Sequence, residues 1–329
     1  MNKYLGHESQ IFGVEEHRLV GGKGDGMRLL QVRNGKGLEF TISLDRCADI
    51  SRLSIDSHNV GYFAPCGYVS PKYYDGQGIG FLKSFTAGFL TTCGLTAVGS
   101  ACEDNGESLP LHGTISNTPS ENHFYTITED EIQIKAVIRQ ASLFGEQLLL
   151  SREYICSLKE NTLKIIDTIK NIGCRTSPFM MLYHFNIGYP MLSENSKVFI
   201  PSDSVIPRNE HAAKSIDDCL KMEFPQAEFE EQCYYHDVKA SVGIFNPDIE
   251  KGLIMRFDKT ELEYFAEWKM MGEHEYVLGL EPGNCTPDGR DVMRKNGKLK
   301  FIEPNQEYTH NIELVFKNGE LYNGTTSEI

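Results

Sequence analysis

The feature that most constrains the fold of this chain is a run of alternating apolar and polar residues from Phe124 to Lys170. Residues 132–138, 148–155 and 163–170 each carry apolar side chains at every second position, and each stretch ends at turn residues. A period of two places one face of a β-strand on a core and the other toward water. Two further strand patterns, at 27–32 and 38–44, flank a Gly-rich turn and predict a hairpin. The pattern therefore predicts an all-β protein built from antiparallel strands.

The length of the chain, 329 residues, fits either two average domains or one large β domain. No internal repeat, low-complexity run or linker divides the sequence, and hydrophobic residues make up 40% of it, enough for a sizeable core. We therefore expect residues 1–329 to form a single β-sandwich domain, with short helices at 81–89 and 212–220.

The charge and the cysteine pattern exclude several classes of function. With 46 acidic and 32 basic residues the net charge is -14, which argues against nucleic acid or an anionic membrane surface as partner. The sequence holds no run of about 18 apolar residues, so no transmembrane helix is expected. The first ten residues lack the apolar segment of a secretion signal. None of the nine cysteines forms a Cys-x-x-Cys pair, which argues against a zinc knuckle and predicts reduced thiols in a cytoplasmic protein.

A strand pattern just past the midpoint, Met181–Pro190, carries a histidine and an asparagine between apolar residues. Alternation places His184 and Asn186 on the same face, while Tyr183 points to the opposite face. Polar groups on an apolar strand must find partners, because burying them unpaired is costly. A core histidine bonded to the backbone remains an alternative to a functional one.

Two other segments carry candidate functional side chains. His112 follows a polar loop and precedes Gly113, whose lack of a side chain lets a ligand approach the backbone. Glu281 ends an apolar strand pattern and is followed by Pro-Gly, so its carboxylate is expected at the mouth of a strand. A solvent-exposed loop histidine and a salt-bridged glutamate are the corresponding structural alternatives.

Arg46 lies between two aspartates, Asp45 and Asp49, after a predicted strand. A local ion pair explains such an arrangement. Alternatively, Arg46 points into a cleft and binds a ligand.

Taken together, the three segments resemble the galactose mutarotase-like (aldose 1-epimerase) family over most of the chain. The similar motifs are Leu111-His112-Gly113, the stretch His184-Phe185-Asn186-Ile187-Gly188, and Leu280-Glu281-Pro282-Gly283-Asn284 with Pro287-Asp288 behind it. The resemblance implies a large antiparallel β-sandwich, in agreement with the strand pattern.

The motifs also depart from the family pattern. Thr114 replaces the second glycine after the first histidine, the central motif is one residue shorter, and the glutamine that follows the family's glutamate is missing. The arginine usually found shortly before the first histidine is missing as well. Arg46 is a candidate replacement, and would suit a sugar that carries a carboxylate, sulfonate or phosphate. The chain thus resembles a divergent branch of the family.

The resemblance implies an isomerase that interconverts the anomers of a sugar by opening and closing its ring. By this resemblance Glu281 is the base, His184 the acid, and His112 a hydrogen-bond donor to the sugar. Asn186, Tyr183 and Trp268 are candidate substrate-binding or wall residues, although Trp268 also suits a core position. The reaction requires no metal and no cofactor, the partner is a small neutral or acidic sugar, and a homodimer is left open. Two alternatives remain: a non-catalytic carbohydrate-binding protein, and another sugar isomerase or lyase on the same scaffold.

Overall fold

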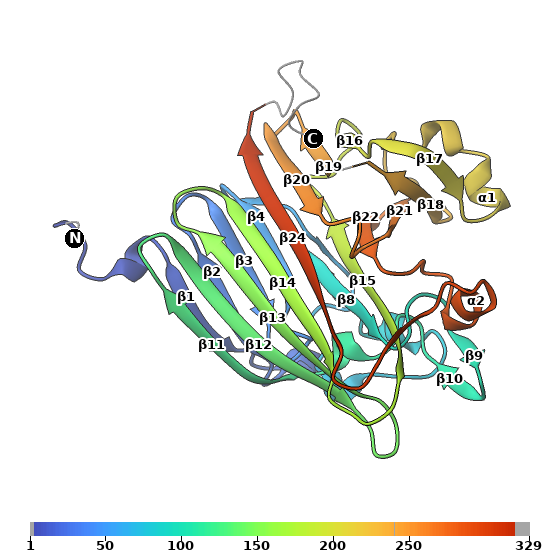
Figure 1. Ribbon diagram of the computed structural model, residues 1–329. Coiled ribbons are helices and arrows are strands. Elements are labelled where there is room, and N and C mark those ends of the chain that lie inside the picture. The colour runs from blue at the N-terminus through green and yellow to red at the C-terminus, as the bar shows by residue number, and fades with distance from the viewer. Residues whose placement is uncertain (1–2, 240, 320–329) are drawn as a thin grey trace.

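The structure, a computed structural model, describes residues 3–239 and 241–319 and confirms the all-β prediction (Figure 1). Within those residues the strands form an eight-stranded, a seven-stranded and a five-stranded sheet, together with two small ribbons. Neighbouring strands pair antiparallel throughout, as in the alternation of β12 (Glu131–Ala141) against β13 (Gln147–Ser157). This is the antiparallel sandwich expected from the sequence.

The eight-stranded sheet contains the long strands that the alternating run predicts. In Figure 1 its strands β12, β13, β14 and β24 lie side by side. The predicted strand at residues 163–170 corresponds to β14, and the buried positions of β12 are every second residue. In sheet order the strands are β11 (Ser120–Ile127), β12, β13, β14 (Thr162–Asn171), β24 (Glu307–Asn318), β20 (Lys251–Phe257), β19 (Val242–Asn246) and β16 (Lys197–Phe199).

The five-stranded sheet packs its apolar face on the eight-stranded sheet. Leu30 and Phe40 from the first and Ile134 and Leu150 from the second belong to one buried cluster that extends to Phe316. The predicted hairpin is confirmed as β2 and β3. The strands are β1 (Gly13–Arg18), β2 (Arg28–Arg33), β3 (Leu38–Ser43), β4 (Asp49–Ile55) and β5 (His58–Asn59). Because one cluster joins strands from both ends of the chain, we propose that the described residues fold as a single domain.

The seven-stranded sheet carries the candidate site. Its central strands are β21, β22, β15 and β8, and β15 is buried along almost its whole length. The strands are β17 (Ser202–Pro207), β18 (Gln232–Val238), β21 (Tyr264–Gly272), β22 (Glu275–Gly283), β15 (Ser177–Ile187) and β23 (Lys300–Ile302), with β8 (Leu90–Leu95) paired to β15. The ribbons are β6 (Tyr62–Phe63) with β7 (Ala87–Gly88), and β9 (Cys102–Asp104) with β10 (Glu107–Leu109).

The helices are short, and one prediction of a helix is largely wrong. In place of a helix at 81–89 the structure has a 3-10 turn, η4 (Gly80–Lys83), followed by β7. Ala87 and Gly88 have φ angles of 57° and 69°, a left-handed conformation that a right-handed helix cannot accommodate. The predicted helix at 212–220 is divided into α1 (Glu210–Ala213) and the 3-10 turn η6 (Ile216–Asp218). A further helix is α2 (Arg290–Lys295), and other 3-10 turns are η1 (Glu8–Gln10), η2 (Gly22–Gly24), η3 (Pro71–Tyr73) and η5 (Ile115–Asn117).

Candidate functional site

A cavity of about 300 Å³ lies on one face of the seven-stranded sheet and brings the three predicted segments together. Its polar lining comes from His112, His184, Arg208, Glu231, Trp268 and Glu281. Its apolar wall comes from the η4 segment, with Phe81, Leu82 and Phe85. We call this cavity the site pocket.

His184 and Glu281 meet in the site pocket because of the register between β15 and β22. The pairing of Leu182 with Gly283 and of Phe185 with Leu280 places His184 opposite Glu281 on the same face of the sheet. The Nε2 atom of His184 lies 3.1 Å from Oε1 of Glu281, and both side chains are buried. The expected face alternation along β15 is therefore present.

A glycine in β22 makes the room that the Glu281 side chain occupies. A Cβ atom at Gly279 would lie 2.5 Å from Oε1 of Glu281 and 2.9 Å from the Cβ atom of Trp268, closer than real contacts allow. Because Gly279 has no side chain, the carboxylate of Glu281 and the indole of Trp268 can both occupy the space beside it.

Burial moves the pKa values of the two groups in opposite directions. Burial raises the pKa of Glu281 to about 8, an effect that the positive charge of Arg208 opposes and the negative charge of Glu231 enhances. Burial lowers the pKa of His184 to about 4, and the Asn186 amide partly opposes this. Between these values the pair holds one transferable proton. The one proton can lie on Glu281, which leaves both residues neutral, or on His184, which leaves an imidazolium facing a carboxylate. Either residue can therefore donate a proton while the other accepts one.

His112 is held at the pocket by its backbone. Its N–H donates to the Gly99 carbonyl at 2.8 Å, and its own carbonyl accepts from the Gly94 N–H at 3.2 Å. Its φ angle of 59° lies in the left-handed region, which non-glycine residues adopt uncommonly. The ring lies 5.6 Å from that of His184, centroid to centroid, and its buried Nδ1 has no hydrogen-bond partner among the described residues. Burial lowers the pKa of His112 to about 3, so the ring is neutral near pH 7.

Arg208 supplies the positive charge of the site pocket, and the sequence analysis missed it. It follows β17 directly, in a stretch that reads as charged and irregular. Its Nη2 donates to the Ser100 hydroxyl at 2.9 Å, and its Nε lies 3.4 Å from Asp288. Arg208 is the only arginine or lysine among the described residues that line the pocket. The sequence feature that could have indicated Arg208 is its position at the end of a strand, the same feature that indicated Glu281.

Trp268 lines the site pocket, as expected for a wall residue. Its Nε1–H donates to Glu231 at 2.7 Å, and its ring meets the His184 ring edge-on at a centroid distance of 5.3 Å. The indole thereby limits the freedom of His184.

Tyr183 does not reach the site pocket, which corrects its interpretation as a substrate-binding residue. It is fully buried on the opposite face of β15, where its hydroxyl donates to Asp167 at 2.9 Å. Arg152 pairs with Asp167 at 2.6 Å and with Asp49 at 2.5 Å in the same core. Tyr183 therefore belongs to an ionic network between the sheets.

Asn186 is also buried and does not line the pocket. Its amide nitrogen donates to the carbonyl of His184 at 2.9 Å. Asn186 thus supports the histidine from within the protein, which corrects its interpretation as a substrate-binding residue of the pocket.

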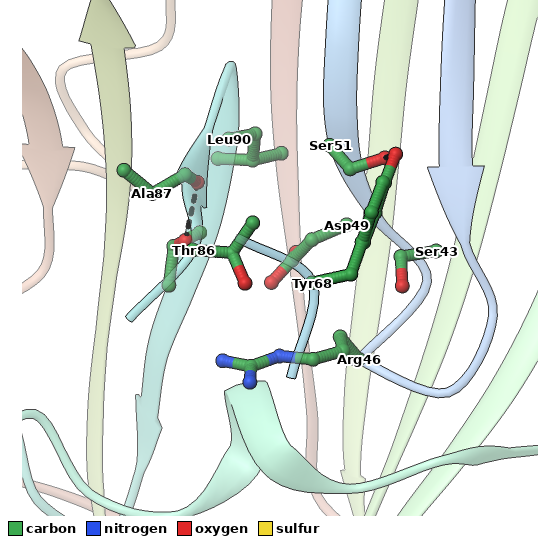
Figure 2. A pocket seen from close by; sticks show the side chains of 9 residues that line it. Ser43, Arg46, Asp49, Ser51, Tyr68, Thr86, Ala87 and Leu90 are labelled. Atoms are coloured by element: carbon green, nitrogen blue, oxygen red, sulfur yellow. Dashed lines mark hydrogen bonds between the residues drawn. The ribbon is translucent and has the colours of Figure 1, made fainter. Parts of the chain in front are cut away.

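Arg46 lies in a different cavity, so its predicted role in binding a substrate at the site pocket is corrected (Figure 2). That cavity has a volume of only about 20 Å³, room for about one water molecule. The buried guanidinium donates to the carbonyl of Val69 at 3.1 Å. The local ion pairs expected in its place are absent as well, because Asp45 pairs with Arg28 and Asp49 pairs with Arg152.

The fold of the chain matches known structures. The chain superposes on a "putative aldose 1-epimerase" from Klebsiella pneumoniae with a TM-score of 0.89 at 22% identity, over 95% of this chain and 86% of that one. A galactose mutarotase-like protein from Clostridium acetobutylicum gives 0.68 at 14% identity, over 94% and 99%. Galactose 1-epimerase from Lactobacillus acidophilus gives 0.61 at 11%, over 94% and 100%. The protein therefore has the galactose mutarotase-like fold.

Residues 24–316 match the family described as "Domain of unknown function (DUF4432)", and the chain belongs to that family. No protein of curated function matches the sequence. Among the described residues no helix has both the length and the apolar character needed to cross a membrane.

Proposed function

We propose that this protein is an aldose 1-epimerase-like enzyme that interconverts the anomers of a monosaccharide. The observation that carries the proposal is the 3.1 Å contact between His184 and Glu281 in a pocket that His112 also lines. The cavity volume, about 300 Å³, is at the lower end of the range for small-molecule sites.

The reaction begins when the proton of Glu281 passes to His184, which leaves a carboxylate facing an imidazolium. The carboxylate removes the proton from the anomeric hydroxyl, the bond between C1 and the ring oxygen breaks, and the imidazolium donates its proton to that oxygen. The resulting aldehyde rotates about the bond between C1 and C2. Reversal of the two proton transfers closes the ring on the other face and restores both residues.

The other lining residues bind and orient the sugar. The neutral His112 ring accepts from or donates to a sugar hydroxyl, and Trp268 forms an apolar wall for the sugar ring. Arg208 offers a cation to a sugar that carries an acidic group, the role that the sequence analysis gave to Arg46. These steps need no cofactor.

Anomer exchange measured by NMR on a panel of neutral and acidic sugars tests the proposal. We expect acceleration for at least one sugar, and a loss of about 10²–10⁴-fold in Glu281→Gln, since positioned acid–base groups contribute about that much. The matched control is Glu39→Gln, because Glu39 is an exposed glutamate on β3, a strand outside the sheet that carries the site pocket.

Two results would contradict the proposal. Exchange at a near wild-type rate in Glu281→Gln would remove this residue from the reaction. Sugar binding without acceleration across the panel would favour a carbohydrate-binding protein, and a change at another sugar carbon would identify a different isomerase.

A further inference from the structure

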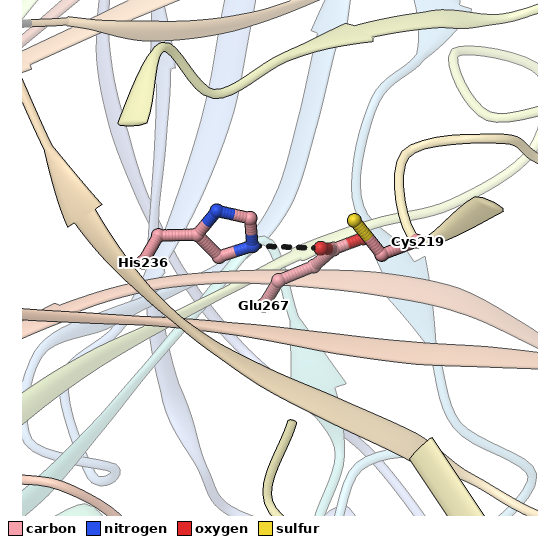
Figure 3. A group of neighbouring side chains, drawn as sticks. All are labelled: Cys219, His236 and Glu267. Carbon is pink, nitrogen blue, oxygen red and sulfur yellow. Dashed lines mark hydrogen bonds and ion pairs between the residues drawn. The ribbon is translucent and has the colours of Figure 1, made fainter. Parts of the chain in front are cut away.

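Figure 3 shows a second group of buried side chains, none of which lines the site pocket. It consists of Cys219, just after η6, His236 in β18 and Glu267 in β21. One potential ligand atom from each residue lies within 4.8 Å of the other two. The pairing of Cys233 with Trp268, whose side chains face the pocket, places Tyr234 and Glu267 on the other face. We call this group the Cys219 cluster.

The hydrogen bonds around His236 indicate which ring nitrogen is free. The Ser202 hydroxyl donates to the carbonyl of Ile200 at 2.8 Å, so its oxygen accepts from Nδ1–H of His236 at 3.1 Å. Nε2 then carries a lone pair, yet it lies 2.9 Å from Oε2 of Glu267, another acceptor. A positive species, either a proton or a metal ion, must lie between them.

In the part of the chain that the structure describes, the carboxylate of Glu267 is a second group in the cluster that has an atom without a partner. Its side chain is completely buried, and its Oε1 atom has no hydrogen-bond partner among the described residues. Native structures rarely leave a buried carboxylate oxygen unsatisfied.

From these contacts we propose that Cys219, His236 and Glu267 bind a divalent transition-metal ion of the zinc class. A thiolate, an imidazole and a carboxylate together are donors that suit zinc, whose bonds to such ligands are about 2.0–2.3 Å long. The Ser202 contact orients the imidazole in the way typical of metal-binding histidines. Three protein ligands leave one coordination position for water.

The charges around the cluster are compatible with a cation. A zinc ion with one thiolate and one carboxylate is neutral overall. The positive charge of the buried Lys269 acts on both Cys219 and Glu267, and its ammonium group is bonded to the carbonyls of Lys221 at 2.6 Å and Asp218 at 3.2 Å, with Glu223 at 3.5 Å. Lys269 therefore has its own partners.

The ion would fasten an irregular segment to the sheet. Cys219 lies within residues 209–230, and the residues that flank this segment, Arg208 and Glu231, both line the site pocket. A metal that joins Cys219 to β18 and β21 would fix the middle of this segment to the sheet. Metal binding at this position would contribute folding free energy.

The test is metal content and cobalt spectroscopy of the full chain. We expect about one zinc ion per purified chain, as for a structural site. We also expect a thiolate-to-cobalt charge-transfer absorption after Co²⁺ replaces zinc. Cys219→Ser should abolish this absorption and weaken zinc binding by more than about 100-fold, whereas Ser202→Ala should weaken it by about 10–100-fold. The matched control is Cys174→Ser, which removes an exposed cysteine.

Substoichiometric zinc in the wild type, or a cobalt spectrum without the thiolate band, overturns the proposal. Equal zinc affinity in Cys219→Ser and Cys174→Ser does the same. Because the wild-type readouts need no variant, a poorly folded Cys219→Ser protein leaves the test decisive. None of the readouts depends on sugar turnover, so the result is independent of the proposed epimerase activity.

Discussion

The seven-stranded sheet carries a buried histidine–glutamate pair on each of its faces, and the two pairs differ in their surroundings. His184 and Glu281 lie 3.1 Å apart beside a cavity of about 300 Å³. His236 and Glu267 lie 2.9 Å apart against a thiol, and Ser202 fixes the ring. The first pair lines a cavity, and the second lies beside a buried thiol. The comparison teaches that a histidine–glutamate pair does not define a chemistry by itself. The space beside the pair and the third group in contact with it determine what the pair can do.

The largest expected difference between the pairs is in the rate of anomer exchange. Glu281→Gln should lower the rate by about 10²–10⁴-fold because it removes the acid–base group. Glu267→Gln, the same change on the opposite face, should lower it by less than about tenfold, since that residue does not line the site pocket. NMR exchange rates of the two variants check the prediction, and equal losses would erase the distinction between the faces.

The placement of Glu281 should matter almost as much as its presence. In Gly279→Ala the new methyl group displaces the carboxylate, and a shift of about 1 Å costs about 10²-fold in rate. The control is Gly272→Ala in β21, where the new methyl group meets only the flexible end of Met270. Single-sugar kinetics and thermal unfolding of both variants check this. A fully active Gly279→Ala protein would contradict the assigned geometry.

The pH dependence distinguishes a proton-sharing pair from a fixed ion pair. The pair holds its single transferable proton between about pH 4, the lowered pKa of His184, and about pH 8, the raised pKa of Glu281. Below that range both residues are protonated and the base is lost; above it both are deprotonated and the acid is lost. We expect kcat/KM to fall about tenfold per pH unit outside both limits. A rate that is constant up to pH 10 would contradict the shared proton.

The smallest expected effect concerns the alkaline limit. The charge of Arg208 lowers the pKa of Glu281, so Arg208→Gln should move the alkaline limit of kcat/KM to higher pH, whereas Arg208→Lys should leave it nearly unchanged. The shift should be below about one pH unit, because Arg208 is shared with Asp288. A shift to lower pH would show that Arg208 acts on another group.

The local sequence predicted the strands well because alternation reports burial directly. The prediction at 163–170 lies within β14, and the hairpin at 27–44 matches β2 and β3. It predicted the helix at 81–89 poorly, because apolar residues at helical spacing line the site pocket there while the backbone turns left-handed at Ala87. The spacing of apolar residues indicates which side chains are buried, but it does not indicate the backbone φ angle.

For the site, three motifs predicted His112, His184 and Glu281, and all three line one cavity. Alternation placed Tyr183 on the face opposite His184, whereas the surroundings of Arg46 could not be predicted, since it lies outside the three motifs and its side chain is buried. Their partners, the carbonyl of Val69 and the carboxylate of Asp167, lie far away along the chain or on another strand.

The sequence by itself determined which residues form strands and which face of its own strand each side chain occupies. Only the tertiary structure decided which strands are neighbours, and so which side chains meet across them. That choice placed Arg208 beside Glu281, and Cys219 beside His236 and Glu267, although neither cysteine spacing nor charge pattern indicated it. The physical reason is that alternation depends on each strand alone, whereas pairing depends on packing between segments distant in sequence.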